Sequence, residues 1–183
     1  MPDSYTIRLL ARGDALAYTA LRREMLNDSP WAYYRSPQED PGCKAELVEN
    51  ELSTVDRYAI AGAFTNDAAS RLVAAAGILR SGSQKTAHRA TVWGVYTSPP
   101  HRGRGLGRAV VSAAIDCALA WRRGPGSPAI EAVTLGVSER STAARALYTA
   151  MGFVAWGAEP DAVRIGTERY AETHMHMDLS VRR

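Results

Sequence analysis

Residues 99–108 read PPHRGRGLGR, and within this stretch three glycines alternate with two arginines and a leucine. The stretch separates a strand-like run over residues 87–97 from a helix-like pattern that begins at Leu106. One interpretation is a tight, glycine-rich turn and nothing more. The other is an anion-binding loop, because a helix start leaves backbone N–H groups unpaired and glycines let several of them converge on one phosphate. The spacing favours the anion-binding loop.

Two familiar phosphate-binding motifs do not fit this loop. A P-loop ends in Gly-Lys-Ser/Thr, whereas Gly107 is followed here by Arg108 and Ala109. A dinucleotide-binding fingerprint requires a third glycine at position 108, where arginine stands. Arg102, Arg104 and Arg108 are candidates for added positive charge around a bound anion, although some of them are expected simply to face solvent.

The pattern around the loop predicts an α/β (α+β) fold. Apolar residues at three- and four-residue steps predict helices over residues 14–27, 40–52, 106–121 and 141–151, the third ended by the Gly/Pro-rich segment 124–128. Alternating or β-rich runs predict strands over residues 5–10, 57–65, 72–80, 87–97, 130–137, 153–159 and 174–179. Asp14 is expected to cap the first helix, and the polar residues 160–172 are expected to form a loop. Strands come first and strand–helix alternation follows, which predicts a mixed, mostly antiparallel sheet of about seven strands with helices on both faces.

Composition indicates one ordinary globular domain over residues 1–183. Hydrophobic residues make up 46% of the chain and charged residues 22%, and neither a repeat nor a second block of composition is visible. The net charge of +3 suits an anionic ligand but is too small to indicate a nucleic-acid partner. The chain has neither a signal-peptide pattern nor an apolar run of about 18 residues, so we expect a cytoplasmic protein without membrane partners. Cys43 and Cys117 have no metal-ligand spacing, so no metal is expected.

Arg102 to Gly107 resembles the Arg/Gln-x-x-Gly-x-Gly/Ala motif of the GCN5-related N-acetyltransferase (GNAT) family. In that family the N–H groups of the loop hold the pyrophosphate of acetyl-CoA, which would be the cosubstrate here. The resemblance also implies that backbone groups of Val95 and Thr97 pair with pantetheine and that Gly94 hosts a bulge. It covers the chain from about residue 7 to 179. The residues that it assigns to acetyl-CoA are Val95, Tyr96, Thr97, Arg102, Gly103, Arg104, Gly105, Leu106, Gly107, Arg108 and Ser141.

Residues 141–153, STAARALYTAMGF, carry a second resemblance to the family. The family pattern is Asn-x-x-Ala-x-x-Leu-Tyr-x-x-x-Gly-Phe, and only its first position departs, because Ser141 replaces the asparagine with a shorter side chain. Seven helical residues place Ser141 and Tyr148 on one face, and Gly152 stands where a helix C-cap is expected. The resemblance makes Tyr148 the general acid that protonates the departing CoA thiolate. The alternative is a core tyrosine whose hydroxyl bonds elsewhere.

The general base is harder to find in the sequence. Residues 87–97 contain no carboxylate, and Gly136 stands in the strand region where some family members carry glutamate. The remaining candidates are His88, Glu139, Glu172, His174, His176 and Asp178. Alternation puts the last two histidines and Asp178 on one strand face and the methionines on the other. Solvated histidines, a water-mediated base and an acceptor that arrives neutral are the alternatives.

Trp31, Tyr33 and Tyr34 fall where the family builds its acceptor wall, and aromatic side chains there suit an amine or aromatic acceptor. Hydrophobic packing under a loop is the alternative. We therefore expect transfer of an acetyl group to a primary amine, on a small molecule in preference, by direct attack in a ternary complex with the oxyanion on the Val95 N–H. A non-catalytic acyl-CoA-binding or sensor module and a protein N-terminal acetyltransferase are the alternatives, and a homodimer is possible by resemblance.

Overall fold

The structure is a computed structural model and describes residues 4–54, 56–121 and 128–180. Its helices are α1 (Ala15–Asp28), α2 (Ala45–Leu52), α3 (Leu106–Ala120) and α4 (Thr142–Met151). Its strands are β1 (Tyr5–Leu9), β2 (Tyr58–Thr65), β3 (Leu72–Arg80), β4 (Arg89–Thr97), β5 (Ala132–Ser138), β6 (Val154–Ile165) and β7 (Glu168–Asp178). None of the helices among these residues is long and apolar enough to cross a membrane.

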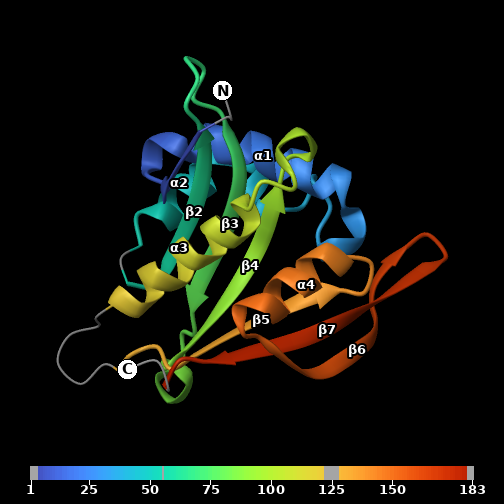
Figure 1. Ribbon diagram of the computed structural model, residues 1–183. Coiled ribbons are helices and arrows are strands. Elements are labelled where there is room, and N and C mark those ends of the chain that lie inside the picture. The colour runs from blue at the N-terminus through green and yellow to red at the C-terminus, as the bar shows by residue number, and fades with distance from the viewer. Residues whose placement is uncertain (1–3, 55, 122–127, 181–183) are drawn as a thin grey trace.

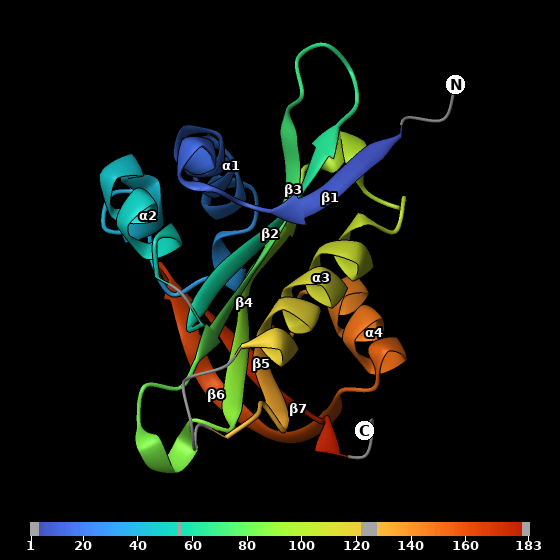
Figure 2. The same ribbon diagram turned by 90° about the vertical axis from the view of Figure 1, so that its left-hand side faces the viewer.

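A seven-stranded sheet with the order β1-β2-β3-β4-β5-β7-β6 forms the middle layer of the protein (Figure 1). Neighbouring strands are antiparallel except for β4 and β5, which pair in parallel. Helices α1 and α2 cover one face of the sheet, and α3 and α4 cover the other (Figure 2). The predicted α/β class, with a mostly antiparallel sheet and helices on both faces, is confirmed.

Each face of the sheet has its own apolar core. Helix α3 buries Val110, Val111 and Ala114 completely against one face. Helix α1 buries Tyr18 and Met25 against the other, each with at most 1% of its surface exposed. These residues fall on one side of their helix, because positions three, four and seven apart share a face, so each helix presents one apolar stripe to the sheet. Burial of each large side chain contributes about 1.5–3 kcal/mol and fixes both helices on the sheet.

Strands β4 and β5 separate in the middle of the sheet. They pair only from Arg89–Thr91 to Ala132–Thr134, although β4 continues beside β3 and β5 beside β7. A bulge follows on β4, since Gly94 and Val95 together oppose a single residue of β3. Gly94 has a φ of +59°, a conformation that favours glycine. The expected bulge at Gly94 is confirmed, and an opening in the sheet begins beside it.

The expectation of a loop over residues 160–172 was wrong. Strand β6 runs to Ile165, β7 begins at Glu168, and the two form a long antiparallel hairpin that extends from the sheet (Figure 1). Pro160 lies at an irregularity in the register, on an edge strand where a missing N–H interrupts no ladder. Asp161 bonds Arg164 within the hairpin. Backbone pairing thus forms these strands without the apolar alternation on which the prediction depended.

The ends of helices α1, α2 and α3 are only partly as the sequence predicts. Asp14 precedes α1 but its carboxylate makes no cap bond to that helix; it accepts bonds from Arg8 and from the Ala11 N–H instead. The second helix begins at Ala45, after a short 3-10 turn over Pro41–Cys43, and not at residue 40. Helix α3 ends at Ala120, and residues 124–127, which we expected to end it, lie outside the described part of the chain.

Candidate active site

A cavity of about 1460 Å³ opens where β4 and β5 separate. One part of its wall is the glycine loop, the start of α3, and the face of α4. The other part comes from the segment after α1 and from the β6–β7 hairpin. The predicted cofactor residues of the glycine loop and α4 and the predicted aromatic wall after α1 therefore line one cavity.

The glycine loop fits the pyrophosphate of acetyl-CoA. Gly103 and Gly105 have φ values of +75° and +78°, so both adopt the left-handed conformation that other residues avoid. Gly105 precedes α3, and the Ala109 N–H bonds the Gly105 carbonyl at 3.1 Å. The N–H groups of the residues between them have no partner inside the helix. Since Leu106 and Gly107 line the cavity, these donors and the positive end of the helix dipole can receive an anion there.

The three arginines of the loop have different positions. Arg102 lines the cavity, donates to the Thr97 carbonyl at 3.0 Å from its Nε, and forms an ion pair with Asp28. Burial raises the pKa of Asp28, but the hydrogen bonds from Arg102 and Ser29 outweigh it, so this pKa lies below its usual value. Arg104 and Arg108 are not among the lining residues.

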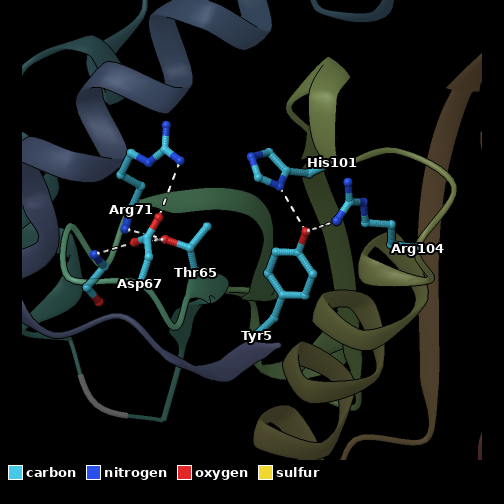
Figure 3. Close-up of polar contacts among 7 residues, drawn as sticks. Tyr5, Thr65, Asp67, Arg71, His101 and Arg104 are labelled. Atoms are coloured by element: carbon cyan, nitrogen blue, oxygen red, sulfur yellow. Dashed lines mark hydrogen bonds and ion pairs between the residues drawn. The ribbon is translucent and has the colours of Figure 1, made fainter. Parts of the chain in front are cut away.

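Arg104 helps to fix the loop to the first strand. Its Nη1 donates to the Tyr5 hydroxyl at 3.0 Å, and the Nδ1 of His101 lies 2.9 Å from the same oxygen (Figure 3). The Tyr5 side chain therefore joins β1 to His101, before the glycine loop, and to Arg104 within it. This contact gives Arg104 a structural role, and its predicted contact with acetyl-CoA stays a prediction.

The end of β4 supplies backbone groups to the cavity. Val95, Tyr96 and Thr97 all line it, as the resemblance requires of the strand that pairs with pantetheine. The Val95 carbonyl accepts a 3.0 Å bond from the Tyr33 hydroxyl. The Thr97 carbonyl is the one that accepts from Arg102. Each carbonyl oxygen has a second lone pair, so these bonds leave room for a ligand donor.

Tyr148 reaches the cavity from α4. Only 5% of its surface is exposed, and its ring meets that of Phe153 edge-on at 5.9 Å between centroids. The helix stops just beyond it because Gly152 has a φ of 100° and the Phe153 N–H bonds the Tyr148 carbonyl at 3.0 Å, which confirms the expected C-cap. Burial raises the pKa of Tyr148, so its phenol stays protonated and able to donate. Ser141 also lines the cavity.

Aromatic side chains form the opposite wall. Trp31, Tyr33 and Tyr34 line the cavity as expected, and Trp156 of β6 joins them. The Trp156 ring stacks on His174 at 5.4 Å, although 66% of this tryptophan is exposed. Sequence reasoning missed Trp156 as a site residue. An exposed tryptophan on an edge strand was the available signal, but only the hairpin brings it to the cavity.

The six candidate bases are separated by their positions. Glu172 and His174 line the cavity, whereas His88, Glu139, His176 and Asp178 do not. The Tyr34 hydroxyl donates to Glu172 Oε1 at 2.7 Å, and His174 Nδ1 lies 3.6 Å from the same oxygen. Met175 and Met177 are buried on the opposite face of β7, which confirms the expected alternation. Among the described residues, no group of three histidine, cysteine or acidic side chains is placed to hold a metal ion.

A buried ion pair behind the β4 bulge was also missed by sequence reasoning. Arg22 of α1 donates from Nη2 to Asp40 at 2.6 Å and from Nε at 3.2 Å, and both residues are at most 8% exposed. The guanidinium lies over the rings of Tyr33 and Trp93, with 5.2 and 5.9 Å between its carbon and the ring centres. The pair fixes the segment between α1 and α2, which carries the aromatic wall, against the sheet.

Comparisons with known proteins point to one family. A family model described as the acetyltransferase (GNAT) family matches residues 20–153. No curated protein matches the chain. Similar solved structures include a GCN5-related N-acetyltransferase from Kribbella flavida, 24% identical, covering 98% of this chain and 100% of that one with a TM-score of 0.75. Another is yncA from Salmonella typhimurium with its cofactor acetyl-CoA, 20% identical, covering 97% of this chain and 95% of that one with a TM-score of 0.76.

A third similar structure has a named acceptor. Ribosomal-protein-alanine N-acetyltransferase from Brucella melitensis is 18% identical, covers 95% of this chain and 99% of that one, and has a TM-score of 0.76. At these identities the structural likeness shows the fold, while the family model, which matches most of the sequence, carries the assignment. The chain therefore belongs to the GNAT family of acetyl-CoA-dependent acetyltransferases.

Proposed function

We propose that the protein transfers the acetyl group of acetyl-CoA to a primary amine on a small molecule, within a ternary complex. One observation carries the proposal: the start of α3, Tyr148 and the aromatic wall all face the cavity where β4 and β5 separate. An anion site, a proton donor and an acceptor wall in one space are what acetyl transfer to an amine requires.

Acetyl-CoA supplies the activated thioester, and the chain supplies its position. The N–H groups before Ala109 hold the pyrophosphate, while the backbone of Val95 and Thr97 holds the pantetheine beside β4. The Val95 N–H donates to the oxygen that becomes negative during attack. Tyr148 gives its proton to the leaving sulfur, and its raised pKa keeps that proton in place until the thiolate forms. Neither cysteine lines the cavity, which supports direct attack over an acetylated cysteine intermediate.

The shape of the acceptor side supports a small acceptor. Trp31, Tyr34 and Trp156 all line the acceptor part of the space. Large rings at these places surround an amine-bearing molecule and exclude water from it. A protein N-terminus would need an open groove instead. We further propose that residues 1–183 form a single domain that acts in the cytoplasm and binds neither nucleic acid nor a membrane. A homodimer is the assembly that we propose to test.

The experiment is CoA-thiol release from acetyl-CoA, measured over a panel of small amines, aminoglycosides, amino acids and short peptides. Wild type and Tyr148→Phe are compared with Tyr18→Phe, since Tyr18 is equally buried but does not line the cavity. The proposal expects release that needs one acceptor class, that falls in Tyr148→Phe and that is unchanged in Tyr18→Phe. Acetyl-CoA binding by calorimetry without release for any acceptor would favour the non-catalytic module. Release with peptides alone would favour the N-terminal acetyltransferase.

A further inference from the structure

Gly136 of β5 leaves a space that a side chain of another strand fills. A Cβ built on Gly136 would lie 1.7 Å from Oε1 and 2.4 Å from Cδ of Glu172 on β7. The register pairs Ser138 with Glu172 and Gly136 with His174, so the Glu172 side chain leans along the strands by two register positions to lie over the glycine. A side chain at position 136 and the present position of the Glu172 carboxylate exclude each other.

This carboxylate is held in the cavity and is not a solvated surface group. The Glu172 side chain is 13% exposed and lines the cavity together with Val95 and Tyr148. Its Oε1 accepts from the Tyr34 hydroxyl and lies 3.6 Å from His174 Nδ1. Oε2 accepts no hydrogen bond from any residue that the structure describes, so it is open to a ligand.

We propose that Glu172 is the general base that deprotonates the acceptor amine, with Gly136 as the residue that makes room for it. The inference rests on the proposed function and names the group that completes it. The ammonium form of the acceptor gives one proton to Glu172, and the lone pair so freed forms the C–N bond to the acetyl carbonyl carbon. The C–S bond then breaks, the sulfur takes the Tyr148 proton, and the second nitrogen proton returns to the Tyr148 phenolate. The proton on Glu172 leaves to solvent, so atoms and charge balance.

The groups around Glu172 come from the segment after α1 and from three strands. Tyr34 faces it from the segment after α1, and His174 faces it from β7. The other ring nitrogen of His174 lies 3.3 Å from Glu159 Oε2 on β6. Strand β5 contributes Gly136 and Ser138, neither of which titrates. Glu139 and Asp178 accept bonds from the N–H groups of Ala171 and Ser180 and do not line the cavity, so Glu172 is the one carboxylate among the six candidate bases that does.

The decisive variant is Glu172→Gln, because an amide oxygen keeps the bond from Tyr34 but cannot accept a proton from an ammonium group. At neutral pH we expect kcat/KM for the acceptor to fall by about 100-fold or more. The rate of the variant should rise steadily with pH as the amine deprotonates by itself, without the plateau of the wild type. Its Kd for acetyl-CoA should match that of the wild type. Glu131→Gln is the matched control, since Glu131 is exposed at the other end of β5 and should leave the rate unchanged.

A relocation experiment tests the part that Gly136 plays. The double variant Gly136→Glu/Glu172→Gly moves the carboxylate from β7 to β5 and should recover at least about 10-fold of the rate lost in Glu172→Gly, a part of the usual acid–base contribution. Gly136→Ala alone should lower the rate, because its methyl group displaces the carboxylate. Thermal unfolding tests whether each variant is folded. If Glu172→Gln does not fold, the comparison of Glu172→Gly with Gly136→Glu/Glu172→Gly still tests the role of the carboxylate.

The outcomes separate this inference from the proposed function. A folded Glu172→Gln with wild-type kcat/KM and pH profile overturns the role of Glu172 and leaves the acetyltransferase proposal standing. If the rate of Glu172→Gln falls by the same factor at all pH values, Glu172 only positions Tyr34. That result also overturns the role of Glu172 as the general base. Wild-type protein that binds acetyl-CoA but releases no CoA with any acceptor overturns both.

Discussion

The two sides of the cavity are built in different ways. On the cofactor side, two nearly continuous segments, residues 93–108 and 141–153, supply the glycine loop, the β4 backbone and Tyr148. On the acceptor side, Tyr34 bonds Glu172 across 138 positions of sequence, and Trp156 comes from a third segment. The cofactor side relies on backbone groups at a helix start, whereas the acceptor side relies on side chains from distant strands. We therefore expect substitutions on the proposed acceptor side to change the acceptor without disturbing the binding of acetyl-CoA.

Tyr148→Phe should have the largest effect on turnover and should sharpen this contrast. Loss of the proton donor is expected to lower kcat by about 100-fold or more, while Kd for acetyl-CoA changes little, because the backbone holds the cofactor. Steady-state kinetics and calorimetry measure the two quantities. Equal turnover in Tyr148→Phe and wild type would remove Tyr148 from the mechanism.

Asp40→Asn should have the largest effect on stability. It leaves the Arg22 guanidinium buried without its counter-charge, so we expect the free energy of unfolding to fall by about 3–5 kcal/mol. Chemical denaturation measures this change. The double variant Arg22→Met/Asp40→Leu removes both charges and should lose less than Asp40→Asn. A loss below about 1 kcal/mol in Asp40→Asn would show that the pair does not hold the acceptor segment in place.

Gly105→Glu should break the cofactor side alone. It puts a side chain at a φ of +78° and a negative charge into the proposed phosphate site, so we expect Kd for acetyl-CoA to rise by about 10-fold or more. Gly166→Glu is the control, because Gly166 has a φ of +60° in the turn between β6 and β7 and lies outside the cavity lining. Calorimetry on both variants separates lost binding from backbone strain. Equal weakening in both would contradict the phosphate-binding loop.

Asp28→Asn should have the smallest effect, at the contact between the end of α1 and the glycine loop. The pKa of Asp28 is lowered in the folded protein, so its contribution to stability is present above its unfolded pKa and is lost as pH falls through the folded value. The variant should be less stable by at most about 1 kcal/mol at pH 7, because Arg102 is half exposed. The difference between the variant and the wild type should shrink as the pH falls through the lowered pKa of Asp28 and its carboxylate becomes protonated. Unfolding curves across this range measure the difference, and a pH-independent difference would contradict it.

Much of the fold was predictable because its signals are local. The periodicity of residues 106–121 and the strand runs before it predicted the layers that the structure confirms. The β6–β7 hairpin was not predictable in the same way. Residues 160–172 carry no apolar alternation, and pairing with a neighbouring strand forms β7 and the end of β6.

The glycine-rich turn before α3, the bulge at Gly94 and the position of Tyr148 on α4 could be predicted from the amino-acid sequence, while the binding of acetyl-CoA by this loop stays a prediction. Positive φ values, helix starts and C-caps depend on a few neighbouring residues, so the local pattern specifies them. The choice among the six candidate bases came from the tertiary structure. The register between β5 and β7 brings the Glu172 carboxylate over Gly136, and the hairpin brings Trp156 to the acceptor wall. Strand register depends on the burial of whole strand faces, and no local spacing encodes it.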